Sequence, residues 1–220
     1  MNPRAAAASA VADAARRLAA EGLLIGTAGN LSMRVDGTEE FVVTRSGVVL
    51  AECAPEDVCS VAATGAVLSG SARPSSEVGL HLGLYADLDI AAVVHTHAPW
   101  STAVACVLDE LPVVHYQQLL LGGAIRVAPY ATFGSEELAA LVRAALVDRQ
   151  AALMANHGAV AVAKTLDQAV ENALLLEWLA TLHHRASVLG TPRPLTTEQQ
   201  ADVIAAVLDR GYGHAQEDHP

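Results

Sequence analysis

Hydrophobic positions recur along the chain at two spacings, and each spacing predicts a different kind of element. Apolar residues at helical spacing predict helices over residues 4–22, 75–85, 99–108, 135–148, 166–189 and 197–210. Short apolar or alternating runs predict strands over residues 31–35, 41–44, 58–61, 66–68, 91–97, 113–114, 125–127, 152–155 and 159–163. The turn-forming pairs Asp36-Gly37 and Thr64-Gly65 separate neighbouring strands and predict hairpins.

The order of these elements predicts the fold class. Hairpins are mixed with helices and show no regular βαβ rhythm, so we expect an α/β domain with three αβα layers. Its central sheet should be mixed, largely antiparallel and flanked by helices. The chain has 220 residues and 52% hydrophobic side chains, which is enough for one sizeable core. We therefore expect one domain over residues 1–220, with a polar and mobile tail from about residue 211.

The charge balance narrows the classes of partner. The formal net charge is −11, from 24 acidic and 13 basic side chains. Such a surface is repelled by phosphodiester backbones and anionic membranes, so we expect no nucleic-acid or membrane partner. A small phosphorylated substrate remains compatible with it, because backbone N–H groups and hydroxyls can hold a single phosphate.

The cysteines and the N-terminus bear on the cellular compartment. Cys53, Cys59 and Cys106 are odd in number and form no CxxC pair, so we expect small core residues in a reducing compartment. Asp13 and the arginines after it interrupt the Ala-rich N-terminus, which therefore lacks the apolar core of a signal peptide. No charge-free stretch approaches the length that spans a bilayer. Together these features predict a cytoplasmic protein.

The sharpest chemical signal is His95-Thr96-His97, at the end of an apolar strand. Residues i and i+2 of a strand point to the same face, so both imidazoles can converge on one ion. Neutral imidazoles suit zinc and similar divalent metals. The same pattern also fits two hydrogen-bonded histidines at a strand end, and this segment alone does not decide between them.

Two further segments add candidate ligands. His157 lies in Asn156-His157-Gly158, between two apolar strands, where it can serve as a metal ligand or as an ordinary turn residue. Glu77 follows Ser75 and Ser76 at the start of a predicted helix, with Ser75 as the N-cap and Glu77 in the first turn. That segment can be a simple cap or a phosphate site at a helix N-terminus.

Two small-residue loops complete the set of candidate segments. They span residues 26–30 and 44–47 and combine glycines with side chains that carry hydroxyls. Loops of this kind can form anion-binding nests, and they also occur as plain hairpin turns. Neither matches a Walker loop or a dinucleotide fingerprint.

Six short segments of the chain resemble motifs of the class II aldolase/adducin family, in the same order and at similar spacing over residues 26–212. They are GTAGNLS, RPSSE, VVHTH, HY, APYATFG and NHG. The branch that is most similar cleaves L-fuculose 1-phosphate. The resemblance implies an aldolase that reversibly cleaves a ketose 1-phosphate to dihydroxyacetone phosphate and a small aldehyde. It also implies bound Zn²⁺, or Mn²⁺ or Co²⁺ in its place, and a homotetramer with active sites between subunits.

The resemblance also assigns roles to particular residues. The metal ligands it implies are His95, His97, His157 and Glu77, of which Glu77 leaves the metal to act as the catalytic base. The implied phosphate site consists of Gly29, Asn30, Ser46, Gly47, Ser75 and Ser76.

Three aromatic residues complete the implied site. Tyr116, in the His115-Tyr116 pair, corresponds to a catalytic tyrosine that reaches the site of a neighbouring subunit. Tyr212 corresponds to a second catalytic tyrosine on a mobile C-terminal tail, and Phe133 to an apolar wall residue.

The loop at residues 44–47 departs from the pattern of the aldolases and leaves the exact substrate open. Arg45 stands where they have an uncharged residue, and it can contact a phosphate or a carboxylate or point to solvent. A pentulose-phosphate 4-epimerase fits less well, because that branch has aspartate in place of Glu77. A decarboxylase of oxo-sugar-acid phosphates, a sugar-phosphate dehydratase and a non-catalytic adducin-like module are further alternatives. A Schiff-base aldolase is disfavoured, because the only lysine, Lys164, lies in a strand–helix connection.

Overall fold

A mixed sheet runs through the molecule. The computed structural model describes residues 2–69 and 73–210. Over these ranges the strands are β1 (Asn30–Arg34), β2 (Glu40–Thr44), β3 (Val58–Ala62), β4 (Val67–Ser69), β5 (Ala92–Thr96), β6 (Glu110–Leu111), β7 (Ile125–Ala128), β8 (Ala151–Met154) and β9 (Gly158–Ala163). Their spatial order is β4-β3-β2-β1-β5-β9-β8-β7-β6, and every described pair is antiparallel except the parallel pair β7–β8. This confirms the predicted sheet.

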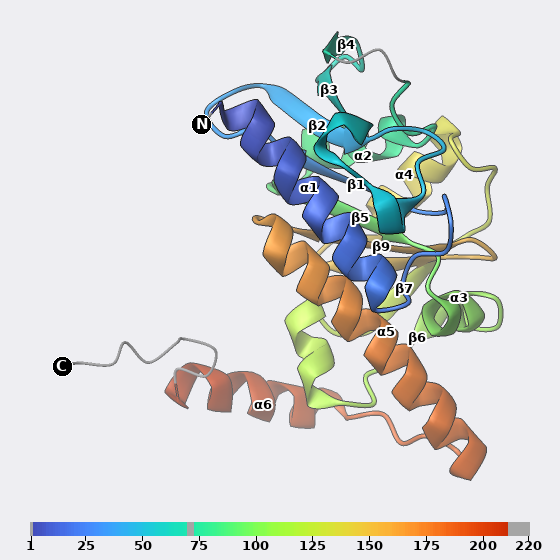
Figure 1. Cartoon of the computed structure of the whole chain (residues 1–220). Coiled ribbons are helices and arrows are strands. Elements are labelled where there is room, and N and C mark those ends of the chain that lie inside the picture. Colours follow the sequence, from blue (N-terminus) through green and yellow to red (C-terminus); the bar gives the residue numbers. More distant parts are fainter. Residues whose placement is uncertain (1, 70–72, 211–220) are drawn as a thin grey trace.

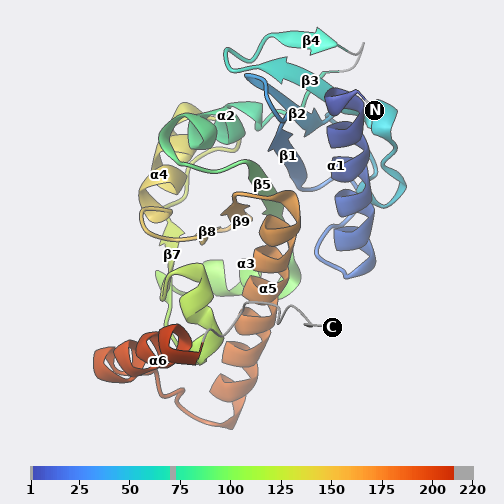
Figure 2. The ribbon, with the colours of Figure 1, turned by 90° about the vertical axis from the view of Figure 1, so that its left-hand side faces the viewer.

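Helices cover both faces of this sheet. The α-helices in the described ranges are α1 (Pro3–Ala20), α2 (Val78–Asp87), α3 (Pro99–Ala105), α4 (Glu136–Ala145), α5 (Leu166–Leu189) and α6 (Thr197–Arg210), and the short 3₁₀ helices are η1 (Leu50–Glu52), η2 (Pro55–Asp57) and η3 (Tyr116–Leu121). Figure 2 shows α2 and α4 on one side of the strands and α1 and α5 on the other. The three predicted layers are therefore present, and α6 lies away from the sheet (Figure 1).

Each face of the sheet has its own hydrophobic core, and β5 contributes to both. Ala92 and Val94 pack in the core under α1 and α5, whereas Val93 packs in the core under α2 and α4. Because successive side chains of a strand alternate between faces, a strand covered on both faces is apolar throughout. His95 continues the Val93 side of the strand, which directs its ring toward the α2 face.

The start of α2 differs from the prediction. The helix begins at Val78 with Glu77 in the N-cap position, whereas Ser75 was the expected cap. The Ser75 N–H donates to the Thr44 carbonyl, and Arg45 pairs with Pro74 in an isolated β-bridge. These bonds hold the chain extended beside β2, so the helix cannot begin until this contact ends. The Ser75 hydroxyl instead accepts a hydrogen bond from the Glu77 N–H.

The segment after α3 also departs from the prediction. The helix ends at Ala105, so Cys106 is exposed and is not a core residue, unlike the buried Cys53 and Cys59. No strand forms at residues 113–114, because the carbonyl of Val113 accepts from Leu195 in the connection to α6. The short pairing with β7 is made instead by β6.

Candidate active site

Four potential ligand side chains meet at one end of the central strands. Glu77, His95, His97 and His157 each offer a ligand atom, and these atoms lie within 4.8 Å of one another. They come from the N-cap of α2, from β5 and the residue just beyond it, and from the β8–β9 turn. Residues far apart in the sequence therefore converge because β5 and β9 are neighbours in the sheet.

The two histidines of β5 face each other through their outer ring nitrogens. His95 is fully buried, and its Nδ1 lies 2.9 Å from the carbonyl of Ala159, to which it donates. The Nε2 of His95 therefore points into the cluster, where it lies 3.0 Å from the Nε2 of His97. A backbone partner on one ring nitrogen that orients the other is typical of metal-ligating histidines.

Glu77 provides the negative charge of the cluster. Its Oε2 lies 3.1 Å from the Nε2 of His95 and accepts a hydrogen bond of 2.9 Å from the Nδ2 of Asn30. Its Oε1 lies 3.6 Å from the Nε2 of His157 and is buried without a hydrogen-bond partner. A buried carboxylate oxygen without a partner is costly, unless a ligand completes its surroundings.

The electrostatics of the cluster keep Glu77 ionised and keep His97 and His157 neutral. Burial acts to raise the pKa of Glu77, but hydrogen bonds from His95 and Asn30 and the charge of His95 lower it overall. Burial, then the neighbouring His95 and His157, lowers the pKa of His97 to about 4. Burial also lowers the pKa of His157. At neutral pH these two rings are therefore unprotonated, the form that binds a metal.

This donor set fits a divalent metal. Three imidazoles and one carboxylate match the nitrogen and oxygen ligands of Zn²⁺ and related ions. The close approach of the Nε2 atoms of His95 and His97 and the unpartnered Oε1 of Glu77 are the observations that support a cation between them. The same observations disfavour a non-catalytic adducin-like module, which has no need of such a ligand cluster.

The turn that carries His157 is built for this position. Asn156 adopts a positive φ of 57°, which asparagine tolerates better than most residues. At Gly158 an added Cβ would collide with the carbonyl of Thr96, so only glycine lets β9 close against β5 at this point. These two neighbours fix the backbone on either side of the histidine.

A pocket of about 320 Å³ opens beside the cluster, within the size range of small-molecule sites. Its lining includes every residue of the expected phosphate site: Gly29, Asn30, Ser46, Gly47, Ser75 and Ser76. The candidate metal ligands and the two small-residue loops therefore belong to one site, as the sequence predicts.

Backbone contacts tie the pocket loops together. The Ser46 N–H donates to the carbonyl of Arg73, next to the bridge between Arg45 and Pro74. An added Cβ at Gly29, where φ is 93°, would lie 2.7 Å from the carbonyl of His95. Glycine therefore lets this loop approach the strand that carries His95 closely.

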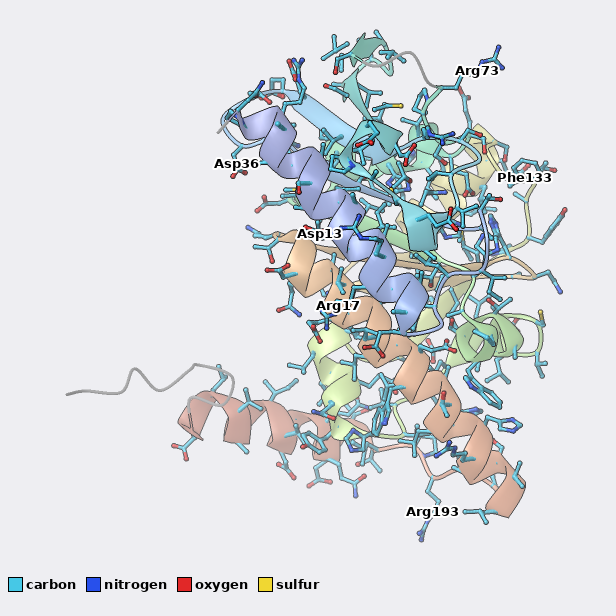
Figure 3. The ribbon with its side chains drawn as sticks, viewed as in Figure 1. Asp13, Arg17, Asp36, Arg73, Phe133 and Arg193 are labelled. Carbon is cyan, nitrogen blue, oxygen red and sulfur yellow. The ribbon has the colours of Figure 1, made fainter. Side chains whose placement is uncertain are left out.

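The three predicted aromatic residues have different outcomes. Phe133 lines the pocket and lies in the loop between β7 and α4, at the edge of the molecule in Figure 3. Tyr116 begins η3, is 43% exposed and does not line this pocket. Tyr212 lies outside the described residues. Lys164 pairs with Asp89 and does not line the pocket either.

Comparison with known proteins identifies the family. Residues 9–184 match the family model described as Class II Aldolase and Adducin N-terminal domain. The chain belongs to this family. Because the match spans most of the chain and all four cluster residues, the site described above lies within the family domain.

Its relatives include enzymes named for ketose phosphates. The chain is 40% identical over 195 residues to a 5-methylthioribulose-1-phosphate/5-deoxyribulose-1-phosphate aldolase of Rhodospirillum rubrum, covering 87% of this chain and 86% of that protein. It is 35% identical over 199 residues to a 5-deoxy-D-ribulose 1-phosphate aldolase of Bacillus thuringiensis serovar kurstaki, covering 90% and 92%. A solved L-fuculose 1-phosphate aldolase superposes with a TM-score of 0.88 at 32% identity, covering 92% of this chain and 96% of that one. The predicted family and fold are confirmed.

Some residues around the site escaped sequence reasoning. Thr27, Tyr130 and Ala131 line the pocket and lie within the motifs GTAGNLS and APYATFG, but the sequence assigned them no role. His81 lies behind the pocket and is hydrogen-bonded to Asn30. It follows Glu77 by four residues, one helical turn, and that spacing is the signal that could have drawn attention to it.

Proposed function

We propose that this protein is a divalent-metal-dependent aldolase that cleaves a ketose 1-phosphate to dihydroxyacetone phosphate and a small aldehyde. The observation that supports this most directly is a carboxylate–trihistidine cluster that opens into a pocket of glycine and hydroxyl loops. Relatives at 35–40% identity are named for reactions of this class.

The proposed metal is zinc, held by His95, His97 and His157, with Glu77 as a further ligand while the pocket is empty. When bound, the metal would polarise the substrate carbonyl and stabilise the negative charge that develops on its oxygen. The other roles fall to side chains of the chain itself.

Glu77 is the proposed base. Glu77 lines the pocket and its Oε1 has no hydrogen-bond partner, so this oxygen is the proposed site of proton exchange. In the cleavage direction Glu77 would return a proton to the carbon of dihydroxyacetone phosphate, and in condensation it would remove one.

The loops are proposed to hold the phosphate. Ser46, Ser75 and Ser76 bring hydroxyls to the pocket, and Gly29 and Gly47 leave backbone N–H groups accessible. Arg45 adds a cation to the same lining. This arrangement recognises one phosphate without a basic surface, which agrees with the net charge of −11.

The aldehyde half of the substrate is proposed to end in an apolar group. Tyr130 and Phe133 line the pocket and are each 66% exposed, so part of the wall is aromatic. A terminal methyl or thioether would pack against these rings, whereas a terminal hydroxyl would lose hydration there. We therefore propose a deoxyketose 1-phosphate as the preferred substrate.

Tyr116 is proposed to act in a neighbouring subunit. It does not line the pocket of its own chain, and it lies beside an exposed apolar surface. In a homotetramer it would exchange a proton with the hydroxyl that becomes the aldehyde oxygen. Tyr212 is proposed as a second tyrosine at the same site.

The decisive experiment is a panel of ketose phosphates assayed with and without chelator. It comprises 5-deoxyribulose 1-phosphate, L-fuculose 1-phosphate, ribulose 1-phosphate, L-ribulose 5-phosphate and an oxo-sugar-acid phosphate. We expect chelator-sensitive release of dihydroxyacetone phosphate, fastest from the deoxy 1-phosphates and restored by Zn²⁺, Mn²⁺ or Co²⁺. Epimerisation of the 5-phosphate or release of CO₂, without aldehyde, would overturn the proposal.

A further inference from the structure

A chain of buried polar side chains lies directly behind Glu77. It consists of Asn30 and Ser32 on β1 and His81 and Tyr85 on α2, which we call the buried relay; each is at most 5% exposed. The Nε2 of His81 lies 2.5 Å from the Oδ1 of Asn30, and its Nδ1 lies 2.6 Å from the Oγ of Ser32. The Tyr85 hydroxyl lies 2.7 Å from the same Oγ.

The carboxylate of Glu77 sets the direction of these hydrogen bonds. A carboxylate only accepts, so Asn30 must present its NH₂ group to Oε2 and its carbonyl oxygen to His81. That carbonyl also only accepts, and the Nε2 of His81 must therefore carry the ring proton. A flipped Asn30 amide would place two acceptors against each other at Glu77.

The remaining bonds follow from the same rule. Burial lowers the pKa of His81 to about 3, so the ring is neutral and its Nδ1 is an acceptor. Ser32 therefore donates to Nδ1, and its oxygen accepts from the Tyr85 hydroxyl. Every donor in the chain consequently points toward Glu77.

The relay gives the two oxygens of Glu77 different surroundings. Oε2 is held by Asn30, whereas Oε1 has no hydrogen-bond partner. A buried polar network of this kind is retained at a cost, because an apolar residue would fill the same space without needing partners. The arrangement is explained if its task is to orient the carboxylate.

We propose that His81 is a positioning residue, which fixes the Asn30 amide so that Oε2 of Glu77 is anchored and Oε1 is left free of hydrogen bonds for proton transfer. This inference rests on the proposed role of Glu77 in proton transfer. The His81 N–H donates to the backbone carbonyl of Glu77, whereas the His81 ring is linked to the Glu77 carboxylate through Asn30 and does not line the pocket. Ser32 fixes the His81 tautomer by donating to Nδ1.

A matched pair of variants separates orientation from packing. His81→Gln keeps a donor near the position of Nε2, whereas His81→Met has nearly the same shape and no donor. We expect His81→Met to lower kcat by about 10- to 100-fold with KM within about threefold, as outer-shell partners typically do. His81→Gln should recover most of the loss. Bound metal and the unfolding midpoint are measured for both variants.

A second measurement needs no catalysis. Long-range ¹H–¹⁵N NMR of the metal-free protein reports which nitrogen of His81 carries the proton. We expect the Nε2–H tautomer, and in Ser32→Ala a mixture of tautomers or a broadened signal. An Nδ1–H tautomer in the wild type would overturn the inference, even if neither His81 variant folds.

The kinetic outcomes are equally decisive. If the Gln and Met variants lose activity equally and in proportion to lost stability, His81 is a packing residue and the inference fails. A wild type that turns over no ketose phosphate, yet shows the Nε2–H tautomer, would refute the proposed function and leave the orientation of Asn30 supported.

Discussion

Two regions of this molecule show opposite chemistry. The metal-ligand cluster is polar and largely buried, and its side chains are held by central strands and tight turns. The second region, which we call the η3–α6 groove, is lined by Tyr116, Gln117, Leu119, Leu120, Val203, Ile204, Val207 and Leu208. Its apolar side chains are exposed, with Leu120 at 63% and Leu208 at 79%. The first region gathers polar side chains from one chain around the unpartnered Oε1 of Glu77, whereas the second leaves apolar surface uncovered.

The difference indicates which parts of the proposed active site a single chain supplies. Ligands, pocket loops and the proposed base are all contributed by the same fold. Tyr116 alone among the described catalytic candidates lies in the groove, outside the pocket. Exposed apolar surface of this kind favours contact with another subunit. A complete site would then need two chains, joined where the groove is covered.

Removing a ligand should have the largest effect. His95→Ala deletes a fully buried imidazole, and we expect loss of stoichiometric metal and at least about a 10³-fold fall in turnover. Metal analysis after gel filtration, alongside kcat, checks both. Full metal occupancy in the variant would contradict the ligand assignment.

Glu77→Gln tests the base while preserving shape. We expect a fall in kcat of about 10²- to 10⁴-fold, the usual range for a general base, with a folded protein that still binds metal. Exchange of the dihydroxyacetone phosphate proton with solvent, followed by NMR, should fall in parallel. A variant that keeps near-normal exchange would remove Glu77 from the proton-transfer step.

Mixing two inactive variants tests whether the two regions meet across subunits. His95→Ala lacks the metal site and Tyr116→Phe lacks the groove hydroxyl, which we expect to cost about 100-fold in aldehyde chemistry. Each mixed subunit pair can then contain one intact ligand set and one intact tyrosine.

After the two proteins are unfolded together and refolded at equal amounts, about a quarter of sites should be wild type in a cyclic tetramer. Activity that stays at the level of the separate variants would show that Tyr116 serves its own chain or no site.

A charge in the groove should have a smaller effect. Ile204→Asp places a carboxylate on a side chain that is 51% exposed, where burial by a second subunit would be costly. We expect a smaller assembly by sedimentation and activity about tenfold lower, with metal binding unchanged. Val67→Asp on β4, far from α6 in Figure 1, is the matched control. Equal sedimentation of both variants with the wild type would contradict an interface at the groove.

The sequence predicted the cluster well because its signals are local. His95 lies in β5, His97 lies one residue beyond it and His157 lies in a tight turn, so local patterns marked these residues and the family resemblance joined them into one set. The alternating layers also followed from hydrophobic spacing. The errors occurred where residues distant in the sequence determine the local structure. Ser75 is not the helix cap, because its N–H donates to the Thr44 carbonyl and holds the chain extended there. Residues 113–114 form no strand, because the Val113 carbonyl accepts a hydrogen bond from the Leu195 N–H. The relay behind Glu77 depends on β1 meeting α2, which no single segment reveals.

The smallest expected effect concerns Arg45, the residue that departs from the aldolase pattern. Its Nε donates to Asp57 at 2.6 Å. Arg45 also lines the pocket, and its other guanidinium N–H groups are the proposed donors to the substrate. A backbone N–H from Ala54 and the bond from Arg45 lower the pKa of Asp57, so this pair stays ionised and holds the guanidinium in place.

A charge-assisted bond from Arg45 to the substrate phosphate would contribute about 1.5 kcal/mol at such a partly exposed site. We therefore expect Arg45→Ala to raise KM about tenfold with little change in kcat, and to weaken inhibition by inorganic phosphate by a similar factor. Arg45→Lys keeps the charge and should recover part of the loss. Unchanged KM and phosphate inhibition in Arg45→Ala would mean that the cation serves only its pair with Asp57. The phosphate would then be held by the serine hydroxyls and backbone N–H groups alone.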